Sequence, residues 1–156
     1  MSERRKPRSG EVISGTHGKV WFDGDLTYEI SSVELKIKTN RETIQFAGEM
    51  WEDSKLMSVS GTWSAKIKKT YSRAKKYAEA LAKGTDMRST IISKLNDPDN
   101  GGTERIEISN CWFDEVTLQQ FENGKICEDE LSGGFIGFKY LDAISDPCVQ
   151  GGNDNE

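Results

Sequence analysis

The middle of the chain alternates between apolar and polar positions with a period of two, the pattern of β-strands that bury one face. The longest such run is Leu56–Lys69, in which Trp63 falls among the apolar positions. Its other side carries small hydroxyl residues, namely Ser58, Ser60, Thr62 and Ser64. Because strands usually span about 5–6 residues, this run predicts an unusually long strand with one polar, exposed face.

Shorter runs of the same period predict further strands, and turn sequences separate several of them. The predicted strands are Val20–Phe22, Leu26–Ile30, Val33–Ile37, Ile106–Ile108, Glu115–Phe121, Lys125–Glu130 and Phe135–Tyr140. Asp23-Gly24 and Glu122-Asn123-Gly124 are hairpin-turn signals, and Gly133-Gly134 precedes the last strand. We therefore expect a mainly β fold with antiparallel strands.

One segment, Ser72–Lys83, has the helical period instead, with apolar residues at the i, i+3, i+4 and i+7 positions. Thr70 or Ser72 is a candidate N-cap, and Gly84 suits the left-handed residue that follows a helix. The sequence thus predicts one helix of about three turns. Its outer face is basic, with Arg73, Lys75, Lys76 and Lys83.

The segment Asn40–Lys55 has no clear period and holds Phe46, Met50 and Trp51 among charged residues. Two interpretations remain open. The segment is either a simple internal hairpin or an excursion whose exposed apolar residues dock on another surface.

Both ends of the chain are polar, so we expect one domain at residues 11–144 between two flexible arms. The arm at 1–10 is basic and the tail at 145–156 is acidic. No apolar region follows the basic N-terminus, which argues against a secretory signal. No run approaches the roughly 20 apolar residues of a membrane helix, so we expect no membrane anchoring.

Few residues offer reactive chemistry. The chain has one histidine, His17, and three cysteines without CxxC spacing, Cys111, Cys127 and Cys148. These counts exclude a site with two histidines and argue against a zinc knuckle or a disulfide framework. Asp97–Gly102 lacks the distal glutamate of a calcium loop and is better explained as a long turn. We therefore expect no catalytic residues, no metal and no cofactor, and the net charge of -5 argues against a general nucleic-acid binder.

Two blocks of sequence resemble a known family. Ile13–Gly24, with its Ile-Ser-Gly start, second glycine and Asp-Gly turn, resembles the opening of phage tail tube proteins of the PBSX-like type. Asn100–Ile108, followed by Trp112–Asp114, resembles their second recurrent block. The resemblance spans about residues 13–142, which leaves only the arms outside it.

The resemblance implies a structural subunit of the inner tube of a contractile tail, from a phage or from a phage-derived bacteriocin (tailocin). The implied fold is an antiparallel β-sandwich or half-barrel with one flanking helix, similar to the type VI secretion tube protein. Such subunits form hexameric rings whose strands close into a continuous barrel, and the rings stack around a hollow lumen for DNA passage or membrane puncture. Implied partners are further copies of the chain, the tail sheath, the baseplate and the tape-measure protein, with DNA only as passing cargo. The implied location is the virion tail or tailocin particle, after assembly in the bacterial host cytoplasm.

In such a tube we expect the polar faces of Leu56–Lys69 and Phe113–Glu130 to line the lumen. The expected lumen residues are Ser58, Ser60, Thr62 and Ser64, the expected contacts between subunits are Phe46, Met50 and Trp51, and the expected sheath-facing residues are Arg73, Lys76 and Lys83. The alternative is an OB-type β-barrel that binds single-stranded nucleic acid. That class needs aromatic residues on the polar face of a strand, where Leu56–Lys69 has hydroxyls instead.

Overall fold

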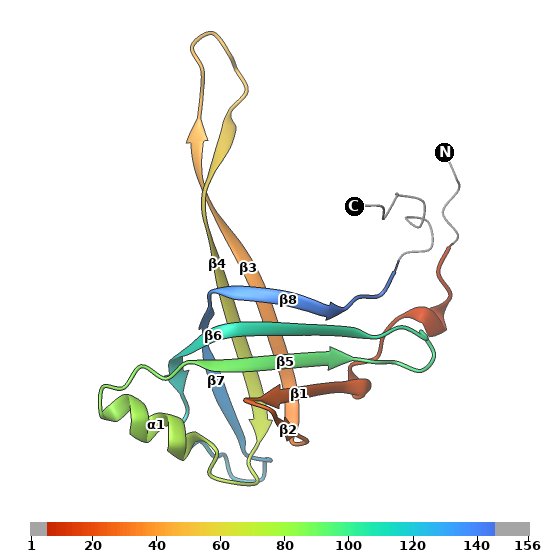
Figure 1. Cartoon of the computed structure of the whole chain (residues 1–156), viewed down its shortest axis with the longest axis vertical. Coiled ribbons are helices and arrows are strands. Elements are labelled where there is room, and N and C mark those ends of the chain that lie inside the picture. Colours follow the sequence, from red (N-terminus) through yellow and green to blue (C-terminus); the bar gives the residue numbers. More distant parts are fainter. Residues whose placement is uncertain (1–5, 146–156) are drawn as a thin grey trace.

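The computed structural model describes residues 6–145 as strands that cross in two layers, with one α-helix at their side (Figure 1). The strands are β1 (Gly18–Phe22), β2 (Asp25–Thr27), β3 (Ile30–Ile44), β4 (Asp53–Lys68), β5 (Ser89–Leu95), β6 (Glu104–Val116), β7 (Glu128–Phe135) and β8 (Gly137–Asp142). The helix α1 is Ala74–Ala82, and two short 3-10 turns are Ser9–Glu11 and Gly15–His17. In the described range, no helix is both long and apolar enough to span a bilayer.

Strand β6 belongs to both layers. Its residues 104–109 pair with β5 and β8, in the sheet that also contains β1 and β2, which we name the short-strand sheet. Its residues 112–116 pair with β7 in the second sheet, which continues through β4 to β3 and which we name the hairpin sheet. Asn110, at a positive φ of 51°, lies between the two halves. The predicted fold class is confirmed: the strands are antiparallel, the fold is mainly β, and a single α-helix flanks it.

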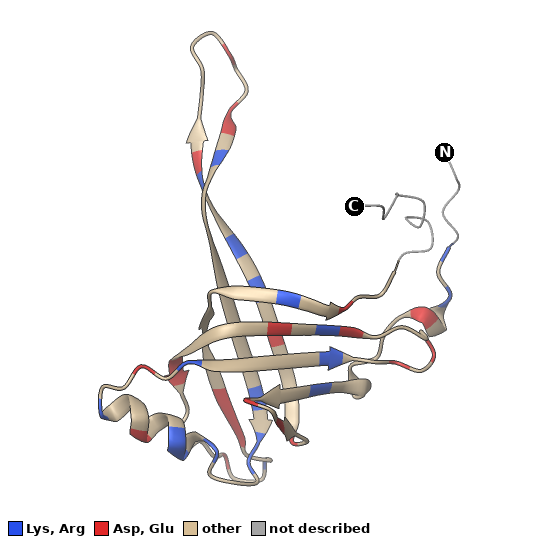
Figure 2. Ribbon diagram, viewed as in Figure 1, with Lys and Arg blue, Asp and Glu red and all other residues tan. Residues whose placement is uncertain are grey.

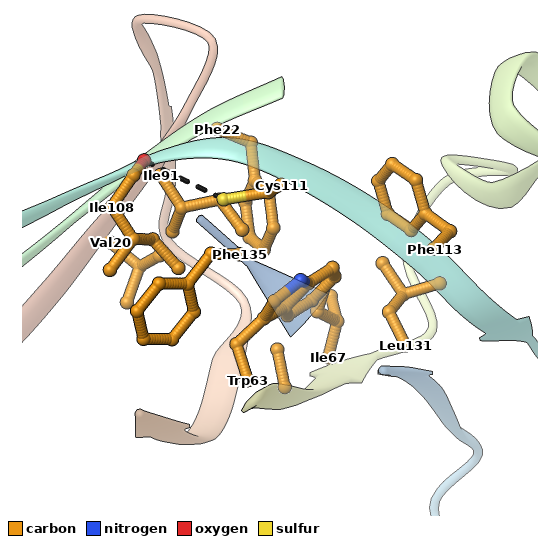
Figure 3. Close-up of a cluster of buried hydrophobic side chains, with 11 residues drawn as sticks. Val20, Phe22, Trp63, Ile67, Ile91, Ile108, Cys111, Phe113, Leu131 and Phe135 are labelled. Carbon is orange, nitrogen blue, oxygen red and sulfur yellow. Dashed lines mark hydrogen bonds between the residues drawn. The ribbon is translucent and has the colours of Figure 1, made fainter. Parts of the chain in front are cut away.

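The core lies between the two sheets (Figure 3). The short-strand sheet contributes Val20, Phe22, Ile91 and Ile108, while the hairpin sheet contributes Trp63, Ala65, Ile67, Leu131 and Phe135. Trp63 is 2% exposed and meets Phe113 edge-to-face at 5.3 Å between ring centroids. Its Nε1 donates a hydrogen bond to the Trp112 carbonyl oxygen at 3.2 Å, which satisfies the polar atom of this buried ring.

The sequence suggested that Gly133 and Gly134 form a break before the last strand. In the structure they lie inside β7. A Cβ on Gly133 would stand 1.7 Å from the Trp112 carbonyl oxygen, and one on Gly134 would stand 2.3 Å from the Trp112 ring. Glycine is therefore required here by the close approach of β6 to β7, not by a turn.

The helix occupies 74–82 within the predicted 72–83, and Gly84 follows it with φ of +80° as expected. The predicted side-chain cap is wrong: Arg73 is the N-cap residue and makes no capping bond, while the Ser72 carbonyl oxygen accepts the Lys75 N–H. The helix is held by packing, since the Tyr77 ring lies 4.4 Å from that of Phe113.

Several strand boundaries differ from the prediction. Strand β5, which pairs with both β1 and β6, was missed because its sequence lacks a clean alternation. The turn at Glu122–Gly124 is confirmed by the Lys125 N–H bond to the Glu122 carbonyl oxygen. The strands predicted around it are too long, because β6 ends at Val116 and β7 begins at Glu128.

Strands β3 and β4 extend far beyond the rest of the body as a two-stranded hairpin (Figure 1). Their pairing reaches Ile44 and Asp53, so Asn40–Lys55 is a hairpin, and it projects from the body of the subunit. A register shift between Asn40 and Arg41 interrupts the alternation near its middle.

Candidate assembly surfaces

The outer half of the β3–β4 hairpin, residues 37–60, carries exposed apolar residues without a partner within the described residues; we name it the distal hairpin. Val59 continues the face of Trp63 and Gly61, yet it is exposed, because the short-strand sheet does not reach this far. Its other exposed apolar strand residues are Ile37, Leu56 and Met57. The sequence predicts a half-buried strand here. The strand is present, but no described residue covers its apolar face.

The loop that closes the distal hairpin carries the three residues predicted as subunit contacts. Phe46, Met50 and Trp51 are 67%, 93% and 86% exposed. Gln45 donates its side-chain N–H to the Glu49 carbonyl oxygen at 3.2 Å, and Gly48 takes a φ of +85°, so the loop has internal order. Large apolar side chains exposed together at a projecting tip are typical of a protein contact.

The outer face of the hairpin sheet is polar and carries the predicted hydroxyl row. Ser58, Ser60, Thr62 and Ser64 are all exposed, opposite the buried residues of β4. A single register row, Glu34–Ser64–Ser132–Glu115, crosses all four strands. Because register partners share a face, small or polar residues extend across the whole sheet.

The charges on this polar face are of both signs. The Lys36 Nζ lies 2.6 Å from a Glu34 carboxylate oxygen, and the Lys66 Nζ lies 3.6 Å from one of Glu130. Figure 2 shows acidic and basic residues interspersed along β3 and β4. This face is therefore of mixed charge and not uniformly acidic.

The hairpin sheet has two open edges. Among the described residues, β3 pairs only with β4, and residues 112–116 of β6 pair only with β7. A groove of about 870 Å³ opens between the sheets beside β3, with Ile30, Val33, Leu35 and Ile106 in its lining. Open edges next to an apolar groove favour pairing with another chain.

The end of the molecule opposite the distal hairpin carries a second exposed apolar surface, the loop 117–127. Leu118, Phe121 and Ile126 are 71%, 76% and 78% exposed. The Lys69 N–H donates to the Cys127 carbonyl oxygen at 2.8 Å, which ties the loop to the end of β4. Sequence analysis assigned these residues to strands and did not single them out. Three exposed apolar side chains around a turn were the available signal.

The three residues predicted to face the sheath differ in their surroundings. Lys76 and Lys83 are exposed on α1, whereas Arg73 is half-buried and pairs with Glu29 through its guanidinium. Arg73 also lies over the Tyr71 ring at 5.6 Å. Its contacts within the subunit attach the start of α1 to the β2–β3 turn.

Each of the two sequence blocks that carry the family resemblance contacts a residue just outside the other block. Asp97, buried at the start of the predicted turn, accepts the Ser14 N–H at 2.9 Å and the Asp99 N–H at 3.0 Å. These two backbone hydrogen bonds hold the pKa of Asp97 below its usual range, and the bond from Ser14 has the larger effect. The Asn100 side chain donates to the Glu11 carbonyl oxygen at 2.6 Å. The turn thus fastens the N-terminal segment to the body.

Two residues with potential chemistry, His17 and Cys111, have opposite environments. His17 is exposed in a 3-10 turn, and Cys111 is fully buried in the core. Burial raises the pKa of the Cys111 thiol to about 11. Cys148 and most of the predicted acidic tail lie outside the described residues, as do residues 1–5 of the predicted basic arm.

Comparisons with known proteins identify the family and the fold of this chain. The profile of the phage tail tube protein family matches residues 5–142. The phage-like element PBSX protein XkdM of Bacillus subtilis (strain 168) is 25% identical over 142 residues, which cover 89% of this chain and 97% of that protein. In fold, the chain resembles the cap that terminates the tube of the anti-feeding prophage, with a TM-score of 0.69, 10% identity, and coverage of 92% of this chain and 96% of that one. It also resembles a chain of the PVC sheath-tube complex of an extracellular contractile injection system in its extended state, with a TM-score of 0.66, 10% identity, and coverage of 85% and 93%.

The chain belongs to the phage tail tube protein family. It is a structural subunit of a tail tube, and the alternative of an OB-type nucleic-acid-binding barrel is not supported. The two solved neighbours come from contractile systems, as the sequence blocks implied.

Proposed function

We propose that the subunit forms closed rings in which the hairpin sheets of neighbours join edge to edge into one barrel. The observation that supports this most directly is the strand order of the hairpin sheet. It has four antiparallel strands, so its edge strands, β3 and the second half of β6, run in opposite directions. When identical subunits are related by rotation, β3 of one then meets β6 of the next as an antiparallel pair.

The proposal has a dimensional consequence. Four strands from each of six subunits would make a barrel of about 24 strands, with strands about 4.8 Å apart and tilted by about 35–45°. Its backbone diameter would be roughly 40–50 Å. The groove beside β3 would then be covered by the neighbouring subunit, which removes both the open edge and the exposed apolar lining.

The polar face of the hairpin sheet would line the lumen, with Ser58, Ser60, Thr62 and Ser64 along β4. Short hydroxyl side chains and charges of mixed sign present no concentrated positive surface, so a passing nucleic acid would gain little from counterion release. Of the predicted Phe113–Glu130 face, only its strand ends, such as Glu115 and Glu130, belong to this surface.

Labelling with a reagent too large to enter the tube tests whether this face lines the lumen. In a Cys127→Ser/Cys148→Ser background, Ser60→Cys is compared with Lys83→Cys on α1. A maleimide attached to a polymer too large for the lumen should label both variants as free subunits, but only Lys83→Cys in assembled tubes. Equal labelling of Ser60→Cys in intact tubes would place this face outside and contradict the proposal.

The distal hairpin would be the axial contact, with Phe46, Met50 and Trp51 docked on a subunit of the next ring or an adjacent subunit. Trp51→Ala should leave the subunit folded, because this side chain is 86% exposed, and should impair tube formation. Negative-stain microscopy at matched concentrations measures tube length, with Glu79→Ala, an exposed position on α1, as the control. Unchanged tubes from Trp51→Ala would refute this role.

The outer surface of the tube would be formed by the short-strand sheet and α1. We propose that Lys76 and Lys83 face a contractile sheath, and that Arg73 contributes mainly by positioning α1. The baseplate and the tape-measure protein would be further partners of the tube. DNA would pass through the lumen or be absent. Assembly would take place in the bacterial host cytoplasm. The role is structural, without catalysis.

A further inference from the structure

The two exposed apolar surfaces of the subunit lie at opposite ends of the hairpin sheet. Trp51 lies two residues before the start of β4, and the loop 117–127 is hydrogen-bonded to the end of β4 through Lys69. Strand β4 has 16 residues, so the two surfaces are about 50 Å apart at a rise of about 3.3 Å per residue. Figure 1 shows them at the two extremes of the long axis.

These two surfaces match in size and in chemistry. The hairpin tip offers three large apolar side chains, and the loop offers Leu118, Phe121 and Ile126 around the turn at Glu122–Gly124. All six are more than 60% exposed, and neither set touches the other within one subunit, given their separation. Each therefore has apolar area that no residue in the range 6–145 covers and that favours contact with another molecule.

The charges at the two ends differ in balance, although each end carries both signs. Residues 41–55 contain four acidic and two basic side chains. At the opposite end Lys68, Lys75 and Glu128 have no ion-pair partner among the described residues, and Glu122 and Lys125 pair with each other at 3.2 Å. Figure 2 shows acidic residues at the hairpin end and lysines at the end of β4 and on α1.

We propose that the loop 117–127 is the receiving surface for the distal hairpin of the subunit in the adjacent ring. This inference rests on the proposed ring assembly and names its axial partner as a second copy of this chain. Because the two patches differ and lie at opposite ends, the contact is head-to-tail and does not close on itself. Rings therefore add indefinitely in one direction, which is what a tube requires.

Cross-linking tests this pairing without altering the six apolar residues. In the Cys127→Ser/Cys148→Ser background, Ala47→Cys places a thiol beside Phe46 and Gln120→Cys places one beside Phe121. Subunits with one substitution each, co-assembled and treated with a short bis-maleimide, should give covalent dimers only in the mixture. The double variant should give a ladder of multimers longer than one ring. The control pairs Ala47→Cys with Lys83→Cys and should give no ladder.

Several outcomes would overturn the inference. Intact tubes in which the Ala47→Cys/Gln120→Cys pair links no better than the control would show that the tip docks elsewhere, while the proposed tube remains. A ladder that stops at the ring size would place the contact within a ring. If the parent protein forms neither rings nor tubes, the proposed function itself fails. A Phe121→Ala variant adds a second measurement, since it should shift the population from tubes to single rings.

Discussion

The alternating sequence of β4 continues from its outer half, at Met57–Ser60, into its inner half, yet the two halves have opposite environments. From Gly61 to Lys68 every second residue is buried, whereas from Asp53 to Ser60 every residue is exposed. The inner half is covered by the short-strand sheet, and the outer half extends past it into the distal hairpin. Alternation therefore shows that a strand has an apolar face, but not whether that face is covered by its own chain or by another.

The largest contrast should come from two tryptophans at the two ends of this comparison. Trp63→Ala removes a buried ring that packs on Phe22 and Phe113, and it should lower the free energy of unfolding by about 3–5 kcal/mol. Trp51→Ala should change it by less than about 0.5 kcal/mol. Chemical denaturation of free subunits measures both, and similar losses would show that the hairpin tip packs on its own subunit.

A second large effect is expected where β6 approaches β7. Gly133→Ala places a methyl group against the Trp112 carbonyl oxygen and should cost about 3 kcal/mol of unfolding free energy. Gly48→Ala is a glycine control in the distal loop, with no neighbour within 4 Å, and it should cost about 1 kcal/mol from its positive φ. A reversed order would mean that β6 and β7 separate easily.

An intermediate effect should depend on pH. The pKa of Asp97 is lowered in the folded chain, so its contribution to stability is present above its ordinary value of 3.8 and is lost as the pH falls through the lower folded value. Asp97→Asn should lower the Tm at neutral pH. The difference from the parent should narrow below about pH 4. A constant difference between pH 7 and pH 3 would contradict this assignment.

The smallest effect on the subunit should come from the strand part of the distal hairpin. Val59→Ser should change the unfolding free energy by less than about 0.5 kcal/mol, because Val59 is exposed in the free subunit. Tubes should nevertheless dissociate at a lower denaturant concentration than parental tubes. Equal resistance would restrict the contact surface to the loop residues.

The reactivity of the Cys111 thiol tests whether the core between the two sheets stays closed. The buried Cys111 thiol, with its pKa raised to about 11, should react with an aromatic disulfide reagent only after unfolding. The Cys127→Ser/Cys148→Ser variant leaves this single thiol. Rapid reaction at pH 8 without denaturant would show that the two sheets open readily.

Local features were predictable because they depend on neighbouring residues. The Asp23-Gly24 turn, with φ of 51° and 89°, follows from residues that tolerate positive φ, and the helix follows from its apolar spacing. Strand β5 was missed because its neighbours β1 and β6 stabilise it more than its own pattern does. The loop 117–127 was predicted as strand because its residues alternate. It is a loop in the structure because these residues have no partner strand to pair with.

The sequence by itself determined that this chain is a mainly β protein with one helix and a long strand bearing a hydroxyl face, and its two short blocks indicated the tail tube family. Only the tertiary structure decided that β6 divides between two sheets, that Arg73 is held by Glu29, and that the apolar residues of the outer hairpin and of the loop 117–127 stay uncovered. The physical reason is that period and turn chemistry are local. Whether an apolar strand face is buried within the subunit depends on how far the opposite sheet extends along that strand.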